Sequence, residues 1–461
     1  MASSQVDEEL PLTSDGQDYE ELADVMSEHD AAVADGRIAT FKARWLTLAL
    51  FCMSTATNAM LWITFSPINS VTQTFYGVSA AEVNVLSIVY LAAYVPVSLG
   101  TNFVFNRLGL RFGIVLACAL NVLSGLVRWL STESNESQRG ASAFTILVIG
   151  QTFGAMAQPF FTNSPAKLGA VWFPAEERDL AVAVAALFNP IGIAVGTVLP
   201  AFYTFDNDDK VRMYDLLLME LIITVLVLVL VGLLFKAKPP VPPSLSELNK
   251  GDLDVVKEMK DLVRNRNFMI LFVTFGTGLG FFNALTTLVE QFVEKSGYTT
   301  DDASQFSALL VGCGIVNAIA MGIVMDKTHK YRELLRGTFV VAGILVVAFV
   351  LVLRPNNFVA IAFVFGMMGA AMLPLLPIAL ESAAECTYPV SEDLSTGWLV
   401  SAGQVTGIFF IVVLGNMLES QPVYTTYTFE PTYIVIVVCT AFFCVGAQFF
   451  NGQYLRLEAE C

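Results

Sequence analysis

Asn106-Arg-Leu-Gly-Leu-Arg111 has a counterpart in Asp326-Lys-Thr-His-Lys-Tyr-Arg332, about half the chain later. Each of these two basic links, the first link and the second link, follows two long apolar segments and precedes a third. A basic, turn-forming link that recurs at the same place in two apolar halves is typical of a duplicated membrane bundle. Gly109 permits a tight turn in the first link.

The composition agrees with a membrane protein. Of the 461 residues, 55% are hydrophobic and 14% are charged. Soluble domains carry about 25% charged residues, so this chain has too few charges to cover a surface that faces water. Most of its apolar runs reach the roughly 20 residues that a helix needs to cross a bilayer.

The apolar runs predict an all-α membrane protein with twelve transmembrane helices in two pseudo-symmetric six-helix bundles. The expected spans are 43–66, 82–105, 112–131, 142–163, 179–204, 214–235, 268–294, 303–325, 335–353, 357–380, 394–419 and 431–453. The expected domains are an acidic disordered cytoplasmic tail (1–42), the first bundle (43–235), a cytoplasmic linker (236–267), the second bundle (268–453) and a cytoplasmic C-terminus (454–461).

The charges predict the orientation. Residues 1–36 hold eleven acidic residues and no Lys or Arg, so they account for most of the net charge of −16. With both termini placed in the cytoplasm, 19 of the 25 Lys and Arg residues fall on the cytoplasmic side, as the positive-inside rule requires. The acidic start lacks the basic and apolar regions of a signal peptide. The chain has no basic patch to meet phosphates, so we expect no nucleic-acid partner.

Two further patterns bear on modification and metal binding. The sequon Asn135-Glu136-Ser137 lies in a link expected on the outer side, where Asn135 is a candidate glycosylation site or a chance triplet. The chain has 7 Cys and 2 His without a metal-ligand spacing, so we expect no metal, no cofactor and no disulfide framework.

Polar side chains inside the spans mark candidate substrate contacts, because an Asp, Lys or Arg in mid-span costs about 2.5–3.5 kcal/mol on insertion scales. Asn58 and Trp62 lie one turn apart. Gln158 lies seven residues after Gln151, and we expect the two to share a helix face. The same spacing predicts that Asn283 and Glu290 share a face. These groups either bind a substrate or form hydrogen bonds between helices. Trp62 could line a cavity or lie at the membrane interface. Glu290 could be a functional carboxylate or a side chain that simply reaches water.

The two links also predict an inner gate. Arg107 and Arg111 hold the first link at the cytoplasm and can pair with carboxylates or helix C-termini. In the second link, Asp326 can accept such bonds and Lys327 adds a charge. Two carboxylates at the inner end of the tenth span, Glu381 and Glu385, are expected to brace this gate. Topological anchoring alone is the alternative.

The links resemble the loop motif of the major facilitator superfamily, Gly-x-x-x-Asp-Arg-x-Gly-Arg. Gly322-Ile-Val-Met-Asp326-Lys327 is the better copy, because the first link has Asn106 where Asp is usual. Longer strings resemble solute carrier family 49, the feline leukaemia virus subgroup C receptor-related transporters. They include Trp62-Ile-x-Phe-Ser-Pro-Ile and Glu381-x-Ala-x-Glu385-Cys-Thr-Tyr-Pro389, and Ser164-Pro-Ala-Lys-Leu with the second link is most similar to the branch called major facilitator superfamily domain-containing protein seven.

This resemblance implies choline and ethanolamine transport, or haem transport under older assignments of the family. The family's choline pocket uses a Trp and two Gln, which match Trp62, Gln158 and Gln404. A Tyr of the pocket is replaced here by Asn283, with Phe281 and Phe282 beside it. Since a quaternary ammonium prefers several aromatic faces, this replacement weakens the expectation of choline. A carboxylate at Glu290 favours a cation or couples a proton.

We therefore expect a monomeric secondary transporter in the lipid bilayer, in the plasma membrane or an endolysosomal membrane. It would carry a small-molecule substrate, an amine-bearing organic cation, by alternating access. Haem or another porphyrin is the second hypothesis, and a non-transporting sensor or receptor on the same scaffold is the third. An enzyme is not expected, because no nucleophile–base pair or metal cluster is visible.

Overall fold

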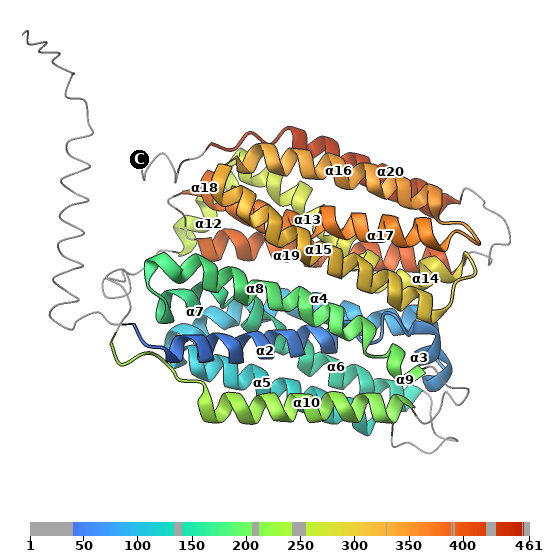
Figure 1. Ribbon diagram of the computed structural model, residues 1–461, viewed down its shortest axis with the longest axis horizontal. Helices are drawn as coiled ribbons and strands as arrows, with labels where there is room; N and C mark the ends of the chain where they lie inside the picture. The colour runs from blue at the N-terminus through green and yellow to red at the C-terminus, as the bar shows by residue number, and fades with distance from the viewer. Residues whose placement is uncertain are drawn as a thin grey trace, which may run out of the picture.

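The computed structural model describes residues 40–132, 141–204, 212–241, 255–328, 330–388, 390, 392–420, 430–453 and 455. In these residues, 12 helices are long and apolar enough to cross a membrane. They form two bundles of six that pack side by side (Figure 1). The predicted fold class is confirmed.

The bundle that we call the N-half contains α2 (Ala43–Ile63), α4 (Ala80–Leu108), α5 (Leu110–Leu130), α6 (Ala141–Thr162), α8 (Ala175–Val198) and α10 (Arg212–Leu234). The C-half contains α13 (Arg266–Thr287), α15 (Thr300–Thr328), α16 (Tyr331–Val352), α17 (Phe358–Met372) followed by α18 (Leu375–Thr387), α19 (Glu392–Glu419) and α20 (Pro431–Gln448). Shorter helices are α3 (Asn69–Tyr76), α7 (Pro165–Trp172), α9 (Ala201–Thr204), α12 (Val255–Arg264) and α14 (Val289–Glu294).

The bundle has two distinct ends. The start of α2, the end of α20 and the short helices α7 and α12 lie at one end, which we call the terminal end (Figure 1). The short helices α3, α9 and α14 lie at the opposite end, which we call the distal end. Because a chain with an even number of spans returns to its starting side, both described chain ends lie at the terminal end.

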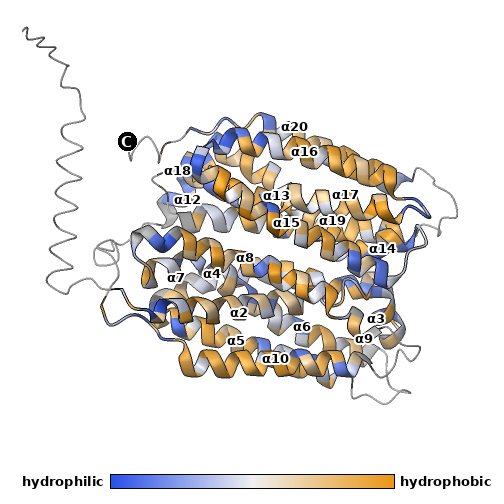
Figure 2. Ribbon diagram, in the orientation of Figure 1, coloured by the Kyte–Doolittle hydropathy of each residue, from blue (hydrophilic) through white to orange (hydrophobic). Residues whose placement is uncertain are grey.

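The flanks of the helices are apolar, and polar residues gather toward the two ends (Figure 2). Side chains such as Leu99, Leu233 and Val359 are more than three-quarters exposed. In water such a surface would drive association, but lipid tails solvate it without cost. The chain is therefore a multi-pass integral membrane protein.

Local chemistry sets several helix ends. A capping box begins α4, because the Ser79 side chain accepts from the Glu82 amide and the Glu82 carboxylate accepts from the Ser79 amide. Gly109 separates α4 from α5 at a φ of 87°, which strongly favours glycine. The tight turn predicted in the first link is confirmed, and the second link likewise joins two helices, α15 and α16.

Most expected spans differ from the structure by a few residues at their ends, and three of these differences change the description of the chain. The first helix ends at Ile63 instead of 66, because Pro67 cannot continue it. The expected span 268–294 is two helices that meet at Leu288, so the prediction that Asn283 and Glu290 share one helix face is wrong. The expected span 357–380 extends to Thr387 as α17 and α18. Asn135 and most of the acidic tail lie outside the described residues.

The two halves meet along α4 against α19 and along α8 against α15. One apolar cluster crosses this boundary, with Trp62 and Leu91 from the N-half and Phe281 and Phe410 from the C-half. Among the expected substrate residues, Trp62 lies at this boundary, where a change in the position of one half reaches it directly.

Candidate functional site

Trp62 lies in the last turn of α2 and faces the boundary between the halves. Its side chain is 5% exposed and packs in the cluster that contains Leu91 and Phe281. In the part of the chain that the structure describes, no group accepts from its indole Nε1. A buried indole usually finds an acceptor, so Trp62 offers both an aromatic face and an unused donor to a ligand.

Gln158 on α6 and Gln404 on α19 have the same property. Their side chains are 6% and 7% exposed, and none of the described residues donates to either Oε1. Gln158 lies one turn beyond Ala155, which belongs to the same apolar cluster as Trp62. A buried acceptor without a donor is costly. Each of these oxygens is therefore a candidate acceptor for a substrate.

Asn283 and Phe282 come from the neighbouring helix α13. The Asn283 side chain is 7% exposed. It packs against Gly407 on α19, where an added Cβ would lie 3.4 Å from the amide nitrogen of Asn283 and 3.1 Å from Leu91 Cδ1. Because Gly407 is one turn from Gln404, Asn283 and Gln404 lie close together. Phe282 is half-buried and packs on the edge of the apolar cluster.

Asn58 is committed to packing inside the N-half. Its amide nitrogen donates to Asn121 Oδ1 at 2.8 Å and to the Gly154 carbonyl at 2.9 Å. Gln151 has a similar role, because its amide donates to the Leu61 carbonyl at 3.3 Å. The Oε1 atoms of Gln151 and Gln158 both lack a donor among the described residues, but a bond to α2 is described only for the amide nitrogen of Gln151.

Glu290 lies at the distal end, in α14, between the spans. The carboxylate is 2% exposed and accepts from the Ser70 amide at 3.1 Å, from the Ser70 hydroxyl at 2.6 Å and from the Thr300 hydroxyl at 2.6 Å. Burial raises its pKa to about 7, although the bonds from Ser70 and Thr300 lower it. Glu290 therefore joins the two halves.

Other polar contacts between the halves surround Glu290. The Ser66 hydroxyl donates to the carbonyls of Thr286 and Thr287. The Gln291 amide donates to Asn84 Oδ1 at 2.7 Å. We call this set the distal latch: Ser66, Ser70 and Asn84 from the N-half, and Thr286, Thr287, Glu290 and Gln291 from the C-half. Its serines and threonines carry no signal in the sequence; Asn84, a polar residue in an apolar run, could have been noticed.

The residues of the predicted inner gate lie at the terminal end. Arg111 donates to the Gly232 carbonyl in the last turn of α10 at 3.0 Å, a pairing with a helix C-terminus of the kind expected from the first link. Arg107 and Lys327 are exposed, Glu381 is half-buried and Glu385 is buried. The side chains of Asn106 and Asp326 lie outside the description.

A buried ion pair was missed by the sequence reasoning. Arg128, which the sequence analysis did not single out, is inside α5 and fully buried, with Nη2 2.8 Å from the Glu220 carboxylate of α10. The signal was present, since Glu220 is a carboxylate well inside the most apolar span. The pair lies against the end of α2, next to Trp62.

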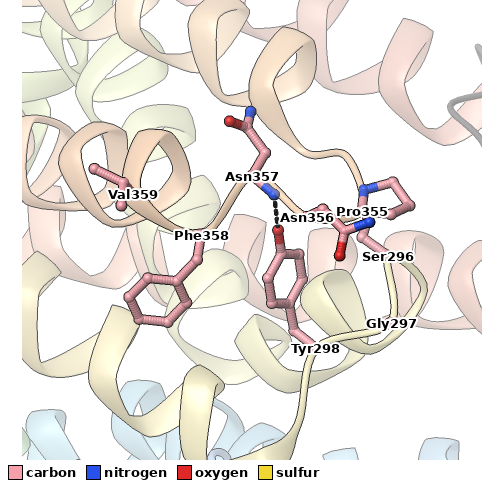
Figure 3. Close-up of a pocket in the computed structure, with 8 residues that line it drawn as sticks. All are labelled: Ser296, Gly297, Tyr298, Pro355, Asn356, Asn357, Phe358 and Val359. Carbon is pink, nitrogen blue, oxygen red and sulfur yellow. Dashed lines mark hydrogen bonds between the residues drawn. The ribbon is translucent and has the colours of Figure 1, made fainter.

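A separate pocket of about 540 Å³ opens between two distal loops of the C-half, lined by residues 296–298 and 355–359 (Figure 3). The Tyr298 hydroxyl accepts from the Asn357 amide at 2.7 Å and donates to the Arg354 carbonyl at 2.9 Å. Every lining residue belongs to the C-half, so this pocket is distinct from the boundary where Trp62 lies.

The family model described as Major Facilitator Superfamily matches residues 50–410. Solute carrier family 49 member A3 of Xenopus tropicalis is 31% identical over 91% of this chain and 90% of its own length. Choline/ethanolamine transporter FLVCR2 of Homo sapiens is 30% identical over 90% of this chain and 79% of its own length.

Two solved structures share the fold. The D-xylose-proton symporter superposes with a TM-score of 0.66 at 15% identity and covers 90% of this chain and 99% of its own. The E. coli fucose:proton symporter superposes with a TM-score of 0.62 at 13% identity and covers 89% of this chain and 100% of its own.

Proposed function

Since the chain belongs to the major facilitator superfamily, and within it to solute carrier family 49, we propose that this membrane transporter carries an amine-bearing organic cation of the choline and ethanolamine class. One observation carries the proposal. Trp62, Gln158 and Gln404 are all buried near the boundary between the halves, and each retains a polar atom that no group among the described residues satisfies.

The chemistry of these three groups fits an ammonium compound. The indole face attracts a cation by about 0.5–2 kcal/mol, and two amide oxygens accept hydrogen bonds. A primary ammonium and a hydroxyl supply four donors, whereas a quaternary ammonium alcohol supplies one. With a single described indole and two unused acceptors, the site favours an ethanolamine-like primary amine over choline. The name of the FLVCR2 relative is consistent with either compound.

The terminal end and the distal end of the bundle have different roles in the transport cycle that we propose. We propose alternating access, in which the N-half and the C-half rock about the boundary that holds Trp62. The distal latch is formed here, so this conformation is closed at the distal end. The excess of Lys and Arg at the terminal end supports a cytoplasmic location for that end, with both termini inside. We also propose domain boundaries at 235–236, just after α10, and at 267–268, in the first turn of α13.

The test is uptake of radiolabelled ethanolamine and choline in cells, normalised to the transporter in the membrane. We expect faster uptake of ethanolamine and a large loss with Trp62→Leu. Trp172→Leu is the matched control, because Trp172 is 2% exposed but lies in a different cluster, at the terminal side of the N-half. Equal losses in both variants would remove the special role of Trp62, and the absence of any amine uptake in the unaltered protein would end the proposal.

The two glutamines allow a finer comparison. Gln158→Leu and Gln404→Leu each remove one acceptor, which should raise the KM for ethanolamine about tenfold and change that for choline less. Equal changes in KM for both amines would show that these oxygens do not accept hydrogen bonds from the ammonium donors that only ethanolamine has.

A further inference from the structure

The C-terminal end of α2 is closed by an unusual set of partners. A helix leaves its last four carbonyls without amide partners inside the helix, and α2 ends at Ile63 because Pro67 follows. The Met60 carbonyl accepts from the amide and hydroxyl of Thr64, and the Ile63 carbonyl accepts from the Ser66 amide at 2.9 Å. These two carbonyls are satisfied locally.

The two carbonyls between them depend on other helices. The Leu61 carbonyl accepts from Arg128 Nη1 at 3.2 Å and from the Gln151 amide at 3.3 Å. The Trp62 carbonyl accepts from the same Gln151 amide at 3.5 Å. The backbone of Trp62 is thus held by side chains from α5 and α6.

Arg128 and Glu220 form one unit around this helix end. Arg128 Nη2 is 2.8 Å from Glu220 Oε2, and the Thr64 hydroxyl donates to Glu220 Oε1 at 2.5 Å. The Arg128 guanidinium lies 4.9 Å from the centre of the Phe65 ring, within cation–π distance. The partial negative charge of the helix C-terminus also attracts the guanidinium. Every one of these partners belongs to residues 61–65 or to the pair itself.

Simple packing does not require such a pair. Arg128 is 0% and Glu220 1% exposed, and removing two charges from water carries a desolvation penalty that well-packed apolar side chains avoid. The forked guanidinium does what an apolar side chain cannot, because it binds the Leu61 carbonyl and Glu220 at the same time.

The helix end that the pair holds connects two functional elements. Trp62 lies at the candidate substrate site, and Ser66, four residues later, donates to the Thr286 and Thr287 carbonyls of the other half. A movement of residues 61–66 therefore moves the indole and the distal latch together.

We propose that Arg128 and Glu220 are positioning residues that fix the end of α2, so that the position of Trp62 and the closure of the distal latch change together. The part of this proposal that concerns substrate rests on the proposed function. The part that concerns closure does not.

The first test measures closure without a substrate. A cysteine in place of Thr287 (Thr287→Cys) leaves the backbone carbonyl for Ser66 and is shielded in the closed state, since Thr287 is 2% exposed. Its labelling by a membrane-impermeant maleimide, corrected for labelling of the parent chain, reports opening of the distal end. In the variant Arg128→Met/Glu220→Leu, which replaces the pair by apolar groups, we expect labelling to be about tenfold faster, as the loss of one to two hydrogen bonds implies.

The matched control is the second ion pair of the N-half. Arg44 and Glu177 are 2.8 Å apart at the terminal end, far from α3. The variant Arg44→Met/Glu177→Leu should leave the labelling of Thr287→Cys unchanged. If this control accelerates labelling as much as the Arg128 and Glu220 variant does, loss of any ion pair loosens the bundle and the proposal is overturned.

The second test measures coupling to the site. In the background Arg128→Met/Glu220→Leu, Trp62→Leu should reduce amine uptake far less than it does alone, because the indole is already misplaced. Additive effects overturn the coupling. Should the unaltered protein take up no amine, the labelling test still decides the proposal. Should the apolar pair fail to fold, Arg128→Lys keeps the charge but loses the fork, and unchanged labelling in that variant overturns the proposal.

Discussion

The Ser70 hydroxyl donates to the Glu290 carboxylate at 2.6 Å across 220 residues of sequence. Ser70 lies in the first turn of α3 in the N-half, and Glu290 lies in α14 of the C-half. The carboxylate also accepts from Thr300 at the start of α15. A single buried carboxylate thus fastens three helices at the distal end and makes closure of that end dependent on its protonation state.

The pH dependence of closure follows from this contact. Burial raises the pKa of Glu290 from 4.5 to about 7, and Glu294 adds to the rise, while the bonds from Ser70 and Thr300 oppose it. When the halves separate, water returns and the pKa falls back toward 4.5. A group with a raised pKa stabilises the closed state fully below the lower pKa, and this contribution is lost as the pH rises through about 7.

We therefore expect the distal end to open as the pH rises. Labelling of Thr287→Cys should be roughly tenfold faster at about pH 8 than at about pH 5.5, after normalisation to the exposed Arg354→Cys. The control Glu290→Gln cannot titrate and should show no such change. A pH profile that survives in Glu290→Gln would assign the titration to another group.

The packing of α2 on α8 gives a prediction about stability. A Cβ added at Gly192 would lie 2.2 Å from the Ala56 carbonyl oxygen, so Gly192→Ala must push the two helices apart. We expect a loss of about 1–3 kcal/mol, seen as a lower thermal midpoint in detergent. At Gly232 nothing lies within 4 Å, and Gly232→Ala should be neutral or slightly stabilising. The same loss in both variants would contradict the packing argument.

The two ion pairs of the N-half should differ in their effect on stability. Arg128→Ala leaves the Glu220 carboxylate, 1% exposed, in an apolar surrounding without its partner, which typically costs about 3–5 kcal/mol. Arg44 and Glu177 are 13% and 36% exposed, and Arg44→Ala should cost at most about 1 kcal/mol. Thermal unfolding of the two purified variants compares them. A midpoint for Arg128→Ala as high as for Arg44→Ala would mean that water or another group replaces the lost partner.

The two links should contribute unequally to the inner gate. Asp326 offers a charge where Asn106 offers an amide, so the second link should form the firmer half of the gate. We expect Asp326→Asn to lower transport far more than Asn106→Ala in the uptake assay, at equal amounts of protein in the membrane. Equal effects would refute this difference between the links.

Several features of the site were predictable and others were not. Trp62, Gln158 and Gln404 stood out because polar and aromatic groups inside an apolar span are costly or unusual. Glu290 was expected inside the span 268–294 but lies beyond the end of α13, in α14. Its partner Ser70 could not be foreseen, because a serine carries no distinctive signal in the sequence. The seven-residue spacing from Asn283 failed because one non-helical residue, Leu288, changes the direction of everything that follows.

The twelve spans, the duplication and the turn at Gly109 could be inferred from the amino-acid sequence alone. These features depend on local rules, because each span must satisfy its own backbone within about 20 apolar residues. The partners of Arg128 and Glu290 could be identified only from the tertiary structure. A charged residue near the end of a span can lie in a loop, lie on the surface or pair with a buried partner, and the local sequence fits all three equally well. The choice depends on a residue far away in the chain: Glu220 neutralises Arg128 inside the N-half, and Ser70 brings Glu290 into the distal latch.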